Sequence, residues 1–155
     1  MELCKGGFKG DKIMNILVSG CLLGIACRYD GKSKPHQPVI ELMDKYNLIP
    51  FCPEAIGGLP TPRPPAEIVG DKVINSQGTD VTAQYSKGAE EALRIAKLYN
   101  CKYAILKEKS PSCGNGLIHN GKFDNGLIDG DGITTRLLKK NGIIVLGESK
   151  IEKLI

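Results

Sequence analysis

The sequence predicts an α/β fold: a Rossmann-like parallel sheet with flanking helices, and long Gly/Pro-rich loops that carry small hairpins. Short apolar runs recur along the chain, they alternate with stretches of helical periodicity, and two glycine-rich segments interrupt the alternation. Short continuous apolar runs are typical of strands that are buried on both faces. Strands that alternate with helices pair in parallel, because each helix returns the chain to the same end of the sheet.

The predicted strands and helices follow one another in a regular order. Strands are predicted at residues 15–19, 48–51, 103–106 and 143–146. Helices are predicted at residues 38–46, 80–100 and 134–140, with a final helical turn or two in 148–155. The first helix should bury one apolar face, made of Val39, Leu42, Met43 and Tyr46. The long helix has Asp80 as its predicted N-cap and an apolar stripe of Ala89, Ala92, Leu93, Ala96 and Leu98.

Two irregular segments fall outside this alternation. Residues 57–78 are rich in Gly and Pro and should form a small hairpin around Gly70-Asp71. Residues 111–132 carry many glycines, with turn signals at Asn120-Gly121 and Asn125-Gly126. Long irregular segments in a compact domain are usually functional or disordered.

The chain has the size of one domain. Its 155 residues suit a single α/β unit, assigned to 14–155, with residues 1–13 as an N-terminal extension outside the core. No apolar run approaches the ~20 residues that cross a membrane. The first residues lack the apolar stretch of a secretory signal, so we expect a cytoplasmic protein. The net charge of +4 forms no basic block, so nucleic acid is not an expected partner, and no feature specifies an oligomeric state.

Three of the six cysteines lie at the ends of predicted strands. Cys21 follows the first strand, Cys52 ends the second, and Cys113 follows the third by a few residues. Open parallel sheets bind their ligands at the carboxyl ends of the strands, so these three thiols should meet there. Because thiols in the cytoplasm stay reduced, ligation, catalysis or simple burial is expected in place of disulfides.

Three convergent thiolates suit two kinds of metal site. An iron–sulfur cube usually takes four cysteines, so three leave one iron free for a substrate. A catalytic zinc site also keeps three protein ligands and one open position, and spacing alone does not choose between the two. Burial as small apolar residues is the third alternative. Cys27 could be a fourth thiol near the site, Cys101 is predicted to pack in the core, and neither His36 nor His119 lies in a cysteine motif.

Polar residues near the same edge are candidates for chemistry. Glu54 could act as a general acid or base beside a metal centre, or could be a surface loop residue. Ser110 could donate a hydrogen bond to a bound ligand or serve as a turn residue. Arg63 could clamp an anion or a carbonyl, or pair with a carboxylate. Arg28 and Lys107 are further candidates for substrate binding, with structural roles as the alternative.

Several motifs resemble, in the same order, those of the thiouracil desulfidases, a family formerly catalogued as a domain of unknown function. The matching segments are SGCLLG (19–24), CRYDG (27–31), CPE (52–54), GGLPTPR (57–63), GTDVT (78–82) and KEKSPSCG (107–114). The resemblance covers residues 14–146 and is specific to the family, but not to one substrate. The departure from the family pattern is the extra N-terminal segment, which contains Cys4.

The resemblance implies both a cofactor and a reaction. It implies a 4Fe–4S cluster on Cys21, Cys52 and Cys113 with one iron left open, and Glu54 and Ser110 as the catalytic pair. It implies non-redox desulfuration of a small thiolated nucleobase, similar to 2-thiouracil, to uracil and sulfide, with the open iron binding the substrate sulfur. The alternatives are a non-enzymatic iron–sulfur or zinc-binding sensor, a zinc hydrolase using the same thiolates, and an enzyme of tRNA processing.

Overall fold

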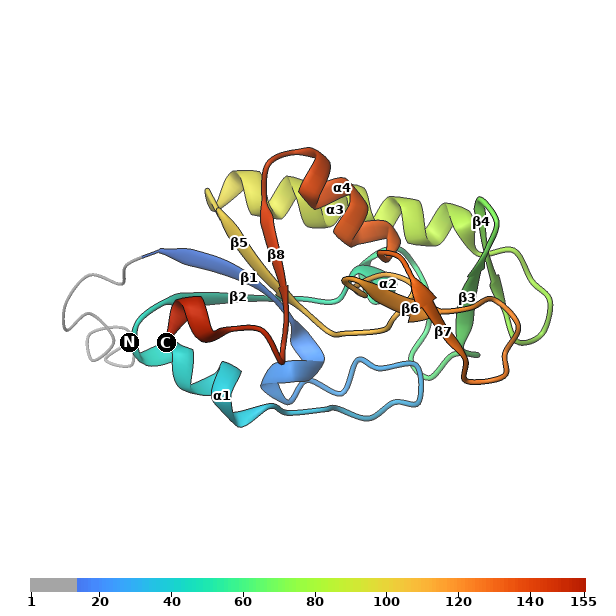
Figure 1. Ribbon diagram of the computed structural model, residues 1–155, viewed down its shortest axis with the longest axis horizontal. Coiled ribbons are helices and arrows are strands. Elements are labelled where there is room, and N and C mark those ends of the chain that lie inside the picture. The colour runs from blue at the N-terminus through green and yellow to red at the C-terminus, as the bar shows by residue number, and fades with distance from the viewer. Residues whose placement is uncertain (1–13) are drawn as a thin grey trace.

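A parallel four-stranded sheet forms the centre of the computed structural model, which describes residues 14–155 (Figure 1). Its order is β2-β1-β5-β8. The strands are β1 (Asn15–Ser19), β2 (Asn47–Phe51), β5 (Tyr103–Leu106) and β8 (Ile144–Gly147). All three neighbouring pairs are parallel, so the predicted Rossmann-like α/β class is confirmed. The predicted extension 1–13, with Cys4, lies outside the described residues.

The central strands are apolar on both faces because helices cover both faces of the sheet. Ile16, Leu17 and Val18 of β1 are almost fully buried, and Ile105 of β5 is buried with them. One face carries α3 (Thr82–Leu98) and α4 (Ile133–Lys140), and the alanines of α3 and Leu138 of α4 pack with Leu17. The other face carries α1 (Gln37–Ile40), a 3-10 turn at Glu41–Asp44 and the C-terminal 3-10 turn Glu152–Leu154. Figure 1 shows these two layers on opposite sides of the sheet.

Two helix predictions were wrong in detail. The predicted helix 38–46 is one α-turn followed by a 3-10 turn, and this change of period turns Met43 outward, where it is 51% exposed. The apolar stripe predicted for the long helix included Leu98, but this side chain is 72% exposed. It lies nine residues after Ala89, about half a turn around the helix from that residue, so it faces away from the sheet.

The two glycine-rich segments form the predicted small hairpins at one end of the molecule. The first pairs β3 (Ala66–Val69) with β4 (Lys72–Asn75), and Gly70 makes the turn with a φ of +64°. The second pairs β6 (Leu117–His119) with β7 (Leu127–Asp129). Both hairpins and the short helix α2 (Pro53–Ile56) lie beyond the carboxyl ends of the sheet strands (Figure 1). Within the described residues, no helix is long and apolar enough to cross a membrane.

Candidate active site

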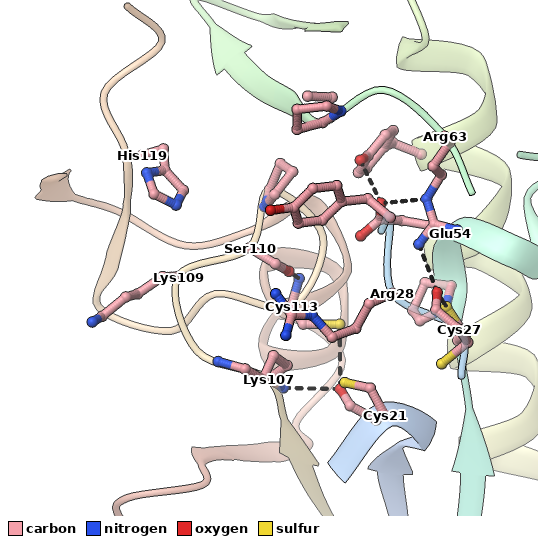
Figure 2. A pocket seen from close by; sticks show the side chains of 18 of the residues that line it. Cys21, Cys27, Arg28, Glu54, Arg63, Lys107, Lys109, Ser110, Cys113 and His119 are labelled. Carbon is pink, nitrogen blue, oxygen red and sulfur yellow. Dashed lines mark hydrogen bonds and ion pairs between the residues drawn. The ribbon is translucent and has the colours of Figure 1, made fainter. Parts of the chain in front are cut away.

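A pocket of about 440 Å³ opens between the carboxyl edge of the sheet and the two hairpins (Figure 2). Its walls come from the ends of β1, β2 and β5, from α2 and from the β6–β7 loop. Every residue that the sequence nominated for the site lies in these walls: Cys21, Arg28, Cys52, Glu54, Arg63, Lys107, Ser110 and Cys113. Segments almost a hundred residues apart therefore share one cavity.

The three nominated cysteines enter the pocket from three different strands. Cys21 lies in the 3-10 turn Gly20–Leu23 that follows β1 directly, and Cys52 comes directly after β2. Cys113 is 5% exposed and lies in a tight turn after β5, where the Ser110 hydroxyl oxygen accepts the Cys113 amide at 2.6 Å. Parallel pairing brings the ends of these strands to the same edge, which is why the thiols converge.

A fourth thiol lies among them. Cys27 also lines the pocket, and its interaction with the Cys21 thiol is the largest cause of its raised pKa. The Cys52 thiol in turn lies 3.6 Å from the Cys27 carbonyl oxygen, to which it donates. Cys101, in contrast, is buried in the core against α3 and α4 and is not part of this pocket.

Burial favours the protonated form of the Cys113 and Cys52 thiols. It raises the pKa of Cys113 to about 12, although the Ser19 hydroxyl, 3.4 Å away, donates to the sulfur and partly opposes this. The pKa of Cys52 is also raised, first by the hydrogen bond with Cys27 and then by burial. Thiolates in this pocket therefore need a positive charge beside them, as iron or zinc would supply.

The donor set fits an iron–sulfur cluster. Thiolates are the ligands that hold such clusters, and each thiolate binds a different iron. Three thiols that follow three strands and line one cavity, two of them buried and that of Cys52 partly buried, match that requirement. Within residues 14–155, no three His, Cys, Asp or Glu side chains form a group that could hold a single metal ion.

Glu54 is held at the pocket by two hydrogen bonds on one oxygen. Its Oε1 accepts from the Tyr85 hydroxyl at 2.7 Å and from Arg63 Nε at 3.1 Å. Burial, and then the Glu54 charge, raises the pKa of Tyr85, so the phenol stays protonated and donates. Tyr85 reaches Glu54 because α2 and α3 approach closely: a Cβ atom at Gly88 would lie 2.0 Å from the Pro53 carbonyl oxygen.

All three guanidinium nitrogens of Arg63 donate hydrogen bonds within the protein. Besides the contact with Glu54, Nη1 donates to the Pro60 carbonyl and the Thr61 hydroxyl, and Nη2 donates to the Cys27 carbonyl at 2.9 Å. Burial opposes its charge most strongly, but the Glu54 carboxylate together with Cys52 and Tyr85 outweighs burial and leaves the pKa of Arg63 above its ordinary value. The side chain, 4% exposed, ties Glu54 to the loop of Cys27.

Replacing Arg63 with methionine should destabilise the protein, because it leaves the Glu54 carboxylate and three carbonyl or hydroxyl acceptors without their donor. Removing one partner of a buried ion pair costs about 3 kcal/mol or more, which corresponds to a Tm about 6–12 °C lower for a chain of this size. Thermal unfolding of the anaerobic protein, compared with the exposed-site variant Arg94→Met, measures the effect. A Tm within 2 °C of wild type, roughly the shift of a single kcal/mol, would contradict the structural importance of this pair.

The remaining nominated residues present polar groups at the pocket wall. Arg28 Nη2 lies 3.7 Å from Asp30 Oδ2. The guanidinium of Arg28 also lies over the Tyr29 ring, with Cζ 5.7 Å from the ring centre. Lys107 Nζ lies 2.9 Å from a Glu148 carboxylate oxygen. Figure 2 shows both side chains beside Cys113 and Cys21.

The loop between the two predicted turns, which the sequence did not assign to the site, forms another wall of the pocket. Residues 120–126 connect β6 to β7, and Phe123 and Asn125 line the pocket with left-handed backbone angles of +56° and +65°. The Glu67 carboxylate, buried on β3, fixes this loop by accepting from the amides of Gly121 at 2.9 Å and Phe123 at 3.2 Å. Each hairpin therefore holds the other in place.

Tyr85, Glu67, His119 and Phe123 line the pocket although sequence reasoning gave them no role there. Tyr85 offered one signal, since a polar-tipped aromatic residue shares a helix face with Ala89 and Ala92. The others had none, because their position depends on how the hairpins dock.

Comparison with known proteins places the chain in a family. The family model described as 2-thiouracil desulfurase matches residues 16–150. The chain is 42% identical over 150 residues to an uncharacterised protein of Bacillus subtilis (strain 168), YbbK, and the match covers 90% of this chain and 99% of that protein.

A solved structure is also similar. It is that of TudS, described as a [4Fe-4S]-dependent thiouracil desulfidase, with a TM-score of 0.83 and 45% sequence identity. The match covers 91% of this chain and 95% of the TudS chain. The resemblance noted in the sequence is thereby confirmed, and the chain belongs to the 2-thiouracil desulfurase family.

Proposed function

We propose that this protein is an enzyme that removes sulfur from a thiolated uracil in a non-redox reaction that depends on a 4Fe–4S cluster, giving uracil and sulfide. The observation that carries the proposal is the convergence of three thiols and an anchored carboxylate on one cavity. Family membership and the 45% identity to TudS support the same reaction.

The proposed cluster ligands are Cys21, Cys52 and Cys113, which leave one iron without a protein ligand. When bound, the cluster would supply at that iron a Lewis acid for the thiocarbonyl sulfur. The protein contributes a buried environment, and the Ser19 hydroxyl donates a hydrogen bond to the Cys113 sulfur.

Glu54 is the proposed general base. Both of its hydrogen bonds fall on Oε1, whereas Oε2 has no partner among the described residues and is not buried. Oε2 can therefore take a proton from a water molecule as that water attacks the ring carbon. A C=O bond replaces the C=S bond, and the two protons of the water, one of them passed on by Glu54, leave with the sulfur as hydrogen sulfide, so no net electron transfer is needed.

Ser110 and the cationic side chains are proposed to orient the bound nucleobase. The Ser110 oxygen already accepts the Cys113 amide, so its own hydroxyl proton is available to donate to the ligand. Arg28 and Lys107 line the pocket and can face polar atoms of the ring, while Arg63 positions Glu54. A cavity of about 440 Å³ suits a small molecule, so a free nucleobase is the proposed substrate.

The proposal also covers domain and compartment. We infer that residues 14–155 form one domain around this site. Free thiols and an iron–sulfur cluster fit a reducing compartment, so the cytoplasm is the proposed location.

Anaerobic purification followed by iron, sulfide and zinc analysis tests the proposal together with turnover of 2-thiouracil. We expect about four iron and four labile sulfide per chain, and one sulfide released for each uracil formed. A full cluster without turnover would favour a non-enzymatic sensor. Stoichiometric zinc without labile sulfide would favour the zinc hydrolase.

A further inference from the structure

His119 lies in the pocket wall at the end of β6, next to the loop 120–126. Figure 2 shows it on the opposite side of Ser110 from Cys113 and Cys21. A ring held with one substituent at the thiols would therefore present its other substituent toward this imidazole.

The two imidazole nitrogens have different surroundings. His119 Nδ1 is the one buried side-chain nitrogen or oxygen without a hydrogen-bond partner in residues 14–155. Nε2 has no hydrogen-bond partner among these residues either, but it is not buried, and the residue lines the pocket. Nε2 is thus the nitrogen that a ligand can reach.

This asymmetry selects one tautomer of the neutral ring. A buried N–H without an acceptor is rarer in proteins than a buried acceptor without a donor. The proton of the neutral imidazole is therefore placed on Nε2, which leaves only a lone pair at the sealed Nδ1. His119 consequently presents an N–H donor to the pocket.

We propose that His119 is a specificity-determining residue whose Nε2–H donates to the ring carbonyl oxygen of the thiolated base. The inference rests on the proposed function, since it concerns the substrate of the same pocket. In 2-thiouracil, the thiocarbonyl and a carbonyl flank one ring N–H, so a base bound through sulfur turns its carbonyl away from the thiols. In 2-thiocytosine an amino group replaces that carbonyl, so two donors would face each other and neither would be satisfied.

The experiment compares 2-thiouracil with 2-thiocytosine in the cluster-loaded enzyme. We expect wild type to prefer 2-thiouracil, and His119→Phe to lower kcat/KM for 2-thiouracil about tenfold, mainly through KM, as the loss of one hydrogen bond predicts. The kcat/KM for 2-thiocytosine should not fall, so the ratio of the two kcat/KM values should decrease by a similar factor. His119→Gln, which keeps a donor, should restore part of the preference, and His36→Gln, at the histidine outside the pocket, should match wild type.

Iron and labile sulfide content of each variant separates a lost contact from a lost cluster, and His119→Leu supplies a second side chain without a donor. An unchanged preference in both donor-free variants with full clusters overturns the inference and leaves the proposed function intact. Absence of turnover by fully loaded wild type overturns the proposed function. In that event uracil binding, measured by calorimetry, still tests the contact: equal affinity for wild type and His119→Phe rejects it, and about tenfold weaker binding by the variant supports it.

Discussion

Replacing Cys113 with serine should leave the purified protein without an intact cluster and lower 2-thiouracil turnover by more than about 100-fold, beyond the loss typical of residues that only support a metal ligand. Serine is close in size to cysteine, so the turn after β5 and the Ser110 hydrogen bond to its amide should persist. A hydroxyl is not the soft, anionic ligand that iron–sulfur clusters take. Iron and labile sulfide per chain, measured anaerobically, give the direct readout.

Two other cysteines provide matched controls for this change. Cys101→Ser alters a buried core cysteine away from the pocket, and it should keep the cluster. Cys27→Ser should also keep it, although Cys27 lines the same pocket and its carbonyl accepts from the Cys52 thiol. If Cys27→Ser lost the cluster and Cys113→Ser retained it, Cys27 would replace Cys113 in the ligand set.

Replacing Glu54 with glutamine should leave the full cluster in place but lower turnover strongly, whereas Cys113→Ser loses both. Glutamine matches the size of glutamate and can still accept from Tyr85 and Arg63, but it cannot take a proton from water. General-base catalysis contributes about 10²–10⁴ in rate, so kcat should fall by that factor. Single-turnover release of sulfide, at matched iron content, measures the chemical step.

Glu90→Gln is the control for this variant, because Glu90 is an exposed residue on α3 outside the pocket. It should leave kcat unchanged. Tyr85→Phe removes one of the two hydrogen bonds on Glu54 Oε1 and should lower kcat by a smaller factor than Glu54→Gln. Full activity in cluster-loaded Glu54→Gln would exclude the carboxylate as the base and would direct attention to Ser110.

The sheet and the convergence of the thiols could be predicted because both follow from local rules. Short apolar runs fixed the strands within one or two residues, and parallel pairing then brought Cys21, Cys52 and Cys113 to one edge. Gly70-Asp71 marked a hairpin through its backbone preference alone. In each case a few neighbouring residues contain the necessary information.

Other parts of the site depend on contacts between distant segments. Tyr85 meets Glu54 across 31 positions, and Glu67 meets Gly121 across 54, through packing that no periodicity encodes. His119 reaches the pocket only because the β6–β7 hairpin docks on β3. The exposed Met43 shows the same limit at smaller scale, since a change from α to 3-10 geometry moved it off the predicted face.

The carboxylate of Glu67 also bears on how the family can diversify. All the thiols come from the β1 to β5 side of the pocket, whereas Phe123 and Asn125 come from a loop that Glu67 joins to β3. The two halves of the cavity therefore have separate sequence determinants. Substitutions in residues 120–126 can alter which ring substituents fit, while the cysteines stay unchanged. The loop keeps its position as long as the Glu67 carboxylate accepts from the amides of Gly121 and Phe123. Changes in this loop can then adapt the fold to new substrates, while the residues that would hold the cofactor stay the same.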